Sequence, residues 1–80
     1  MVSSEDVTQE LILRTVVEAS KPLTVRGIST AIRYHTNTPW TVVFRVQELE
    51  RAGLVTWQHK RPWHVEITDA GRQQDAEGGG

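Results

Sequence analysis

Apolar residues recur with helical spacing near the start of the chain, from Ser3 to about Ser20. Ser3 followed by Asp6 predicts a capping box at the start of this helix. The pair Lys21 and Pro22 predicts its end, because proline disfavours helical geometry in the residue before it. The apolar positions of the predicted face are Val7, Leu11, Ile12, Leu13, Val16 and Val17.

Two further stretches have the same spacing. The first covers residues 23–33, with Thr24 as its capping residue. The second begins with Thr38 at the cap and Pro39 in the first helical position, and Gly53 predicts its end. The inward positions are Val25, Ile28 and Ile32 in one helix, and Val42, Val46 and Leu49 in the other.

The pattern changes after Gly53 from helical spacing to alternation of apolar and polar residues. Residues 54–58 and 63–68 predict two short strands, joined by a polar and basic turn over residues 59–62. Trp57 and Trp63 flank this turn, and we expect them to pair across the hairpin, with direct contact to a partner as the alternative.

A capped helical turn is expected over residues 68–72, and the polar residues 73–80 predict a disordered tail. The sequence therefore predicts an α+β fold with three helices and a two-stranded antiparallel hairpin. Residues 1–72 form the predicted domain.

Composition narrows the class of protein. A chain of 80 residues forms one domain with a small core. The absence of cysteine excludes disulfides and thiolate zinc sites. No apolar run reaches the roughly 18 residues of a membrane span. The acidic N-terminus also lacks the order of a signal peptide, so we expect a cytoplasmic protein with no membrane contact.

Charge is unevenly distributed along the chain, although the formal net charge is only −1. Both ends are acidic, whereas the middle is basic. Local charge matters most when a surface meets an anion, since screening limits interactions to roughly 8–10 Å. Residues 21–64 hold two acidic side chains, Glu48 and Glu50, against Lys21, Arg26, Arg33, Arg45, Arg51, Lys60 and Arg61.

Two local motifs carry a resemblance to a known family. Residues 46–55 (VQELERAGLV) are similar to the end of the recognition helix in winged helix-turn-helix proteins of the MarR-like and PadR-like branches. Residues 65–72 (VEITDAGR) resemble the strand that ends in a Thr-x-x-Gly turn in these proteins. A weaker similarity lies at residues 23–24, where the second helix opens. The resemblance spans roughly residues 5–72 and implies a three-helix winged helix-turn-helix with a two-stranded antiparallel β-wing.

The resemblance also implies sequence-specific binding of double-stranded DNA by a small transcriptional regulator. The third helix would enter the major groove, while the wing would lie on the backbone or in the minor groove. The base-facing candidates are Trp40, Thr41, Phe44, Arg45, Gln47 and Glu48. The backbone-facing candidates are Thr24, Arg26, Ser29, Arg33, Arg51, Lys60 and Arg61.

The aromatic residues leave a second function open. Trp40 and Phe44 lie one turn apart on the outer face of the third helix, whereas base edges mostly offer donors and acceptors. With Trp57, they would also suit a winged-helix interaction module, or a small inhibitor, that binds a cellular protein. Helix-turn-helix proteins often pair on two-fold sites, so a homodimer is also open.

Catalytic and metal chemistry is not expected. The sequence has no Gly-rich phosphate loop and no Gly-x-Ser-x-Gly elbow, so we predict that the protein is not an enzyme and needs no cofactor. His35, His59 and His64 have no spacing typical of metal ligands.

Overall fold

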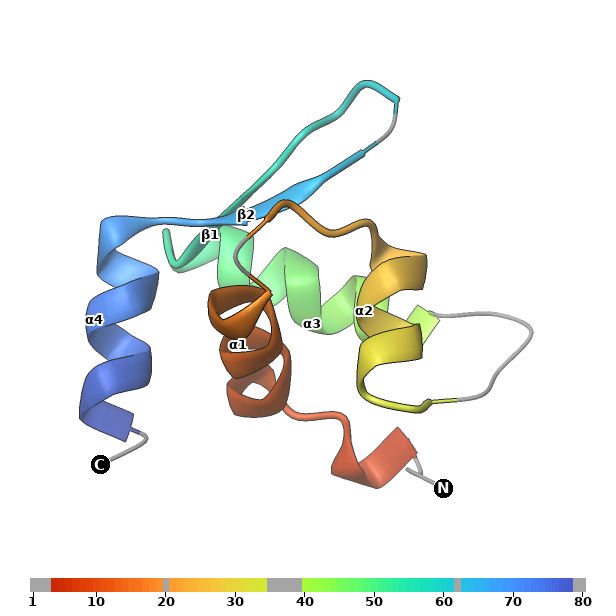
Figure 1. Ribbon diagram of the computed structural model, residues 1–80, viewed down its shortest axis with the longest axis horizontal. Helices are drawn as coiled ribbons and strands as arrows, with labels where there is room; N and C mark the ends of the chain where they lie inside the picture. Colours follow the sequence, from red (N-terminus) through yellow and green to blue (C-terminus); the bar gives the residue numbers. More distant parts are fainter. Residues whose placement is uncertain (1–3, 20, 35–39, 62, 79–80) are drawn as a thin grey trace.

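The computed structural model describes residues 4–19, 21–34, 40–61 and 63–78, which form four α-helices and one two-stranded antiparallel sheet (Figure 1). A short 3₁₀ helix, η1, covers Ser4–Asp6. The other elements are α1 (Gln9–Glu18), α2 (Val25–Ala31), α3 (Trp40–Arg51), β1 (Val55–Trp57), β2 (Val65–Ile67) and α4 (Asp69–Gly78).

Helix α1 begins later than the sequence predicted. Its N-cap is Thr8, whose Oγ1 accepts a hydrogen bond from the Leu11 amide at 3.1 Å. The predicted start of this helix at Ser3 is therefore wrong, and the predicted capping box involves Ser3, which lies outside the described residues. Val7 is fully buried although it precedes the helix, so the apolar pattern included a residue from the connecting segment.

Helices α2 and α3 follow the sequence prediction more closely. Thr24 caps α2, as expected, by accepting a hydrogen bond from the Gly27 amide at 3.0 Å. Helix α3 buries the three predicted inward residues Val42, Val46 and Leu49. The predicted cap of α3 at Thr38 and Pro39 lies outside the described residues.

Gly53 ends α3, as predicted, in a left-handed conformation with φ of +77°. Its amide donates to the Glu50 carbonyl, and the Leu54 amide donates to the Leu49 carbonyl, both at 3.0 Å. This pair of hydrogen bonds is the Schellman arrangement, which satisfies carbonyls that the helix itself leaves free. The chain therefore turns sharply out of α3 and directly into β1.

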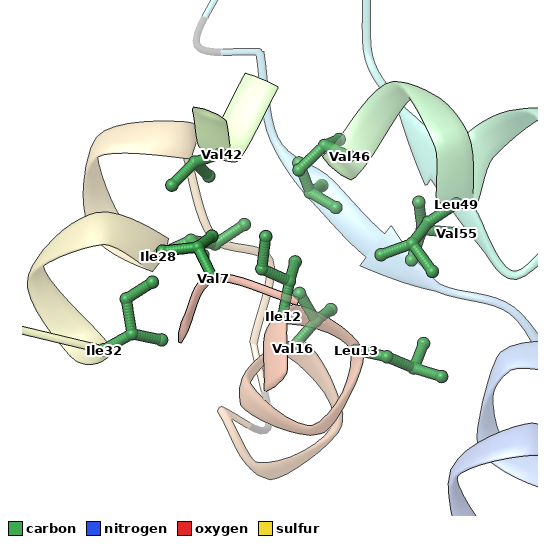
Figure 2. Packing of buried hydrophobic residues seen from close by; sticks show 11 residues of the cluster. Val7, Ile12, Leu13, Val16, Ile28, Ile32, Val42, Val46, Leu49 and Val55 are labelled. Atoms are coloured by element: carbon green, nitrogen blue, oxygen red, sulfur yellow. The ribbon is translucent and has the colours of Figure 1, made fainter. Parts of the chain in front are cut away.

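The core lies between α1, α2, α3 and the sheet (Figure 2). Its members are all aliphatic and small to medium in size, so the core itself stabilises the fold through burial of apolar surface. They are Val7, Ile12, Leu13, Val16, Ile28, Ile32, Val42, Val46, Leu49, Val55 and Val65.

Strand β2 is paired on both sides. It pairs with β1 in the register Val55 to Ile67 and Trp57 to Val65. On its other side, Val65 forms an antiparallel bridge with Leu23, with N···O distances of 2.6 and 3.2 Å. The expected cross-strand pairing of Trp57 with Trp63 is wrong, because the register places Val65 opposite Trp57. A hydrogen bond from the Trp57 indole to the Trp63 carbonyl, at 3.2 Å, links the two residues instead.

The prediction of a disordered tail from residue 73 is wrong, because helix α4 extends to Gly78. The described part of the chain therefore has four α-helices, where the sequence predicted three. Thr68 caps the helix by accepting a hydrogen bond from the Gly71 amide at 3.0 Å. The helix packs along α1 (Figure 1). Between the two helices, Arg14 Nε lies 3.8 Å from Asp75 Oδ1. This packing partner stabilises a polar segment whose own pattern does not predict a helix. Residues 79–80 lie outside the described part.

Gly71 allows α4 to approach the start of the hairpin. A methyl group at this position would overlap the Leu54 carbonyl oxygen, which is main chain and cannot rotate away. We expect Gly71→Ala to reduce the free energy of unfolding by about 3 kcal/mol, as for severe overpacking of a core. Chemical denaturation followed by circular dichroism measures this loss.

Gly27→Ala is the matched control. The added methyl group would meet the Thr24 hydroxyl oxygen at 3.3 Å and otherwise lie in ordinary contact with Leu23. Helix propensity favours alanine here, so we expect a change within about 1 kcal/mol of the original protein. Equal effects of the two substitutions would contradict a specific close approach at Gly71.

Candidate nucleic-acid interface

The outer face of α3 presents two large aromatic side chains. Trp40 and Phe44 are 61% and 59% exposed, and their spacing of four residues places them one above the other on the helix. Gln47, half-buried, and Arg51, exposed, continue this face toward the end of the helix. The face therefore combines apolar surface with one amide and one cation.

Arg45 and Glu48, which we predicted to face the bases, instead attach α3 to the segment around the start of α1. Arg45 donates from Nε to the Val7 carbonyl at 3.1 Å and from Nη1 to Glu48 at 2.8 Å. Gln9 donates to the other oxygen of Glu48 at 2.9 Å. We call these four residues the α3 latch. Both charged groups form hydrogen bonds within the fold and so help to position the helix, while their side chains stay 40% and 41% exposed.

The hydrogen bond from Arg45 is the main reason that the pKa of Glu48 lies below the ordinary carboxyl value, and the hydrogen bond from Gln9 lowers it further. The ionised form of Glu48 is therefore the one that the folded protein favours.

On α2 and at its two ends, the predicted backbone-facing residues separate into two groups. Arg26 and Arg33 are exposed. Ser29 is buried, and its hydroxyl donates to the Val25 carbonyl at 3.1 Å, so the structure places it inside the domain. Thr24 is half-buried and engaged in its cap.

Arg33 has a backbone conformation that normally suits glycine, with φ of +60°. It occupies the position after α2 that Gly53 occupies after α3, and the Tyr34 amide donates to the Ser29 carbonyl at 2.9 Å. A side chain in this region costs roughly 1 kcal/mol. Tyr34 then links this turn to α3, since its hydroxyl lies 3.4 Å from the Thr41 hydroxyl.

The hairpin carries the remaining cations at its tip. Lys60 and Arg61 are exposed, and the Arg61 guanidinium carbon lies 5.2 Å from the centre of the Trp63 ring. Trp63 is 48% exposed and also has a positive φ, of +55°. We did not include Trp63 among the candidate DNA contacts. The sequence contains no signal for its conformation, although its position beside the basic turn could have suggested the residue.

A contact between side chains joins the hairpin to α3. His59 Nε2 lies 3.2 Å from a carboxylate oxygen of Glu50, and the His59 ring lies 6.1 Å from the Trp57 ring. Trp57 is half-buried and packs on the core, which limits its exposure to a partner. The end of α3 and the hairpin are therefore linked near the exposed basic residues.

The basic middle of the chain carries an excess of positive charge, with seven Lys or Arg side chains against two Glu in residues 21–64. Each acidic side chain of residues 21–64 has a partner: Glu48 is in the α3 latch and Glu50 faces His59. Within the described residues, no ion pair involves the five exposed cations of α2, α3 and the hairpin. We call this set the free cations; it consists of Arg26, Arg33, Arg51, Lys60 and Arg61.

A metal site, a ligand-binding cleft and a membrane-spanning helix each require particular features of the described part of the chain. No group of three His, Asp or Glu residues there could hold a metal ion. Two shallow clefts, of about 170 and 240 Å³, lie on either side of α1 and away from the free cations. No helix in this part is long and apolar enough to cross a membrane.

The element order and the paired hairpin define a winged-helix domain. The chain is similar to a MarR family protein from Bacillus stearothermophilus, with a TM-score of 0.72 and 23% identity over 86% of this chain. A MarR family transcriptional regulator from Rhodococcus sp. RHA1 gives a TM-score of 0.72 and 26% identity over 89%. The third similar structure is the Bordetella bronchiseptica protein BpsR, whose DNA binding is regulated by 6-hydroxynicotinic acid. Its TM-score is 0.74, with 18% sequence identity over 96% of this chain.

This chain spans about half of each of these solved chains, 47%, 50% and 51% respectively. No protein-family model matches the sequence, and no curated protein matches it. The winged-helix fold is thus confirmed, while the resemblance to the PadR-like branch stays a prediction.

Glu48 provides a test of the α3 latch through pH. Because its pKa is lower in the folded than in the unfolded protein, its contribution to stability is present above about pH 4.5 and is lost as pH falls through the lowered folded value. Glu48→Gln should therefore reduce the difference in unfolding free energy between pH 7 and pH 3. Urea titrations at the two pH values measure it.

Glu77→Gln is the control, since this exposed carboxylate lies near the end of α4, away from the latch. It should leave most of the pH dependence in place. If both variants reduce the difference in unfolding free energy between pH 7 and pH 3 equally, the α3 latch does not stabilise the ionised form of Glu48.

Proposed function

We propose that this domain binds double-stranded DNA in a sequence-specific manner and acts in transcription regulation. The free cations are the observation that carries the proposal. They lie on or beside the elements that contact DNA in winged-helix proteins, and the two acidic side chains of residues 21–64 are hydrogen-bonded within the fold, Glu48 to Arg45 and Glu50 to His59. Phosphate contacts of this kind supply affinity, and contacts to bases supply specificity.

In the proposed complex, α3 enters the major groove and the hairpin lies along the backbone or in the minor groove. Arg51 and Gln47 on α3 offer donors to bases or phosphates, and Phe44 suits the methyl group of thymine. Arg26 and Arg33 would contact the backbone beside α3. The similarity to solved MarR family regulators supports this arrangement.

A homodimer is part of this proposal. Two copies on a two-fold site would place two α3 helices in successive major grooves about 34–36 Å apart. Sedimentation of the protein with and without a duplex that holds two half-sites distinguishes one bound copy from two.

Binding to duplex DNA should depend strongly on salt. If all five free cations contact phosphates, affinity should fall roughly 500-fold between 50 and 200 mM salt. Lys60→Ala combined with Arg61→Ala should weaken binding and reduce the slope of log affinity against log salt by about 2. Fluorescence anisotropy with a labelled duplex measures both quantities.

Lys21→Ala combined with Arg72→Ala removes the same charge from the cleft that the end of α1, strand β2 and the start of α4 form. This control should leave the slope nearly unchanged. If both double variants show the same slope of log affinity against log salt, the hairpin does not contact the DNA backbone. If the original protein does not bind duplex DNA at 50 mM salt, the proposal is wrong.

The exposure of Trp40 and Phe44 favours a second candidate, a module that binds another protein. Exposed aromatic side chains are common centres of protein interfaces. For this function, Phe44→Ala should abolish capture of a partner in a pull-down while thermal unfolding stays unchanged. A folded variant that still captures the partner would exclude Phe44 as its anchor.

A further inference from the structure

Trp63 has an unusual combination of backbone conformation and exposure. Its φ of +55° lies in the left-handed region, which a bulky residue rarely adopts. Two hydrogen bonds hold this conformation: the Trp63 amide donates to the Lys60 carbonyl at 2.7 Å, and the Trp63 carbonyl accepts from the Trp57 indole at 3.2 Å. The conformation is therefore built into the hairpin by its neighbours.

Folding alone does not explain a tryptophan at this position. Glycine or asparagine would adopt the same conformation with less strain. The ring of Trp63 is 48% exposed, whereas Trp57 packs on the core. Strained residues that the surrounding structure maintains are concentrated at functional sites.

The surroundings of the ring indicate what it binds. The Arg61 guanidinium is 5.2 Å from the ring centre, and Lys60 is exposed in the same turn. An aromatic surface beside two cations is complementary to a ligand that carries apolar or π surface next to negative charge. Nucleic acid has this composition, because deoxyribose and base faces lie beside phosphates.

We propose that Trp63 contacts DNA directly, with its ring against a deoxyribose or a base face next to the phosphates that Lys60 and Arg61 bind. The inference rests on the proposed function and deepens it, since it adds a stacking contact to the electrostatic one. The strained backbone positions the ring for this contact before DNA arrives.

Trp63→Asn tests the contact while keeping a residue that tolerates the left-handed conformation. We expect thermal stability to be unchanged or raised and affinity for a duplex to fall roughly tenfold, in the range for loss of one stacked group. Trp63→Phe, which keeps a ring, should restore most of the affinity. Gln58→Ala, an exposed position in the same hairpin, is the control and should bind normally.

The outcomes separate this contact from the proposed function. A folded Trp63→Asn protein that binds within twofold of the original overturns the contact but leaves DNA binding intact. If Trp63→Asn and Trp63→Gly both unfold the domain, the ring is structural and the inference is wrong. If the original protein binds no duplex, both proposals are overturned.

A second duplex distinguishes the two surfaces that the ring could use. In a duplex with one unpaired base, a base face is available without unstacking. If the ring stacks on bases, the original protein should bind this duplex several-fold more tightly than the intact one, and Trp63→Asn should remove the gain. If the ring lies on deoxyribose, both duplexes should bind equally and both should lose affinity in Trp63→Asn.

Discussion

The carbonyl group of Leu54 is the point on which the arrangement of α3, the hairpin and α4 depends. It accepts a hydrogen bond from the Thr68 amide at 3.2 Å, and Gly71 packs against it. The Thr68 hydroxyl donates to the adjacent Gly53 carbonyl at 2.7 Å while its oxygen caps α4. Four elements thus meet at one short stretch of main chain. The direction of the hairpin relative to α3 follows from these contacts and needs no long side chain.

This junction gives the candidate interface a rigid base. The core and the α3 latch hold α3 from one side, and the contact of His59 with Glu50 holds the hairpin to its end. The same contacts engage the acidic groups that would oppose an anionic ligand. The side chains that orient α3 and the hairpin therefore include both acidic residues of this region, and neither of these forms an ion pair with the free cations. Because acidic residues are concentrated at the two ends of the chain, a domain with a net charge of −1 can still present a basic surface.

The sequence predicted those parts of the fold that depend on local pattern. Val42, Val46 and Leu49 identified the buried face of α3 because their spacing matches the helical period, and Gly53 identified its end. The pattern could not predict α4, because that helix is polar and depends on packing against α1. The resemblance placed Arg45 among the base-facing residues, but no local pattern encodes its hydrogen bond to a carbonyl 38 residues away. The conformation of Trp63 depends on hydrogen bonds with the Lys60 carbonyl and the Trp57 indole, which the alternation of apolar and polar residues does not encode.

The α3 latch has a consequence for how the sequence can vary. Arg45 binds the Val7 carbonyl, and every amino acid at position 7 carries the same acceptor. Substitution of Val7 can disturb packing but cannot delete this hydrogen bond, whereas most substitutions of Arg45 would. An insertion or deletion between residues 7 and 9 would move the carbonyl away from the guanidinium. The orientation of α3 is thus sensitive to the length of this segment and to the side chain of Arg45, and much less to the identity of the residues that supply the acceptor.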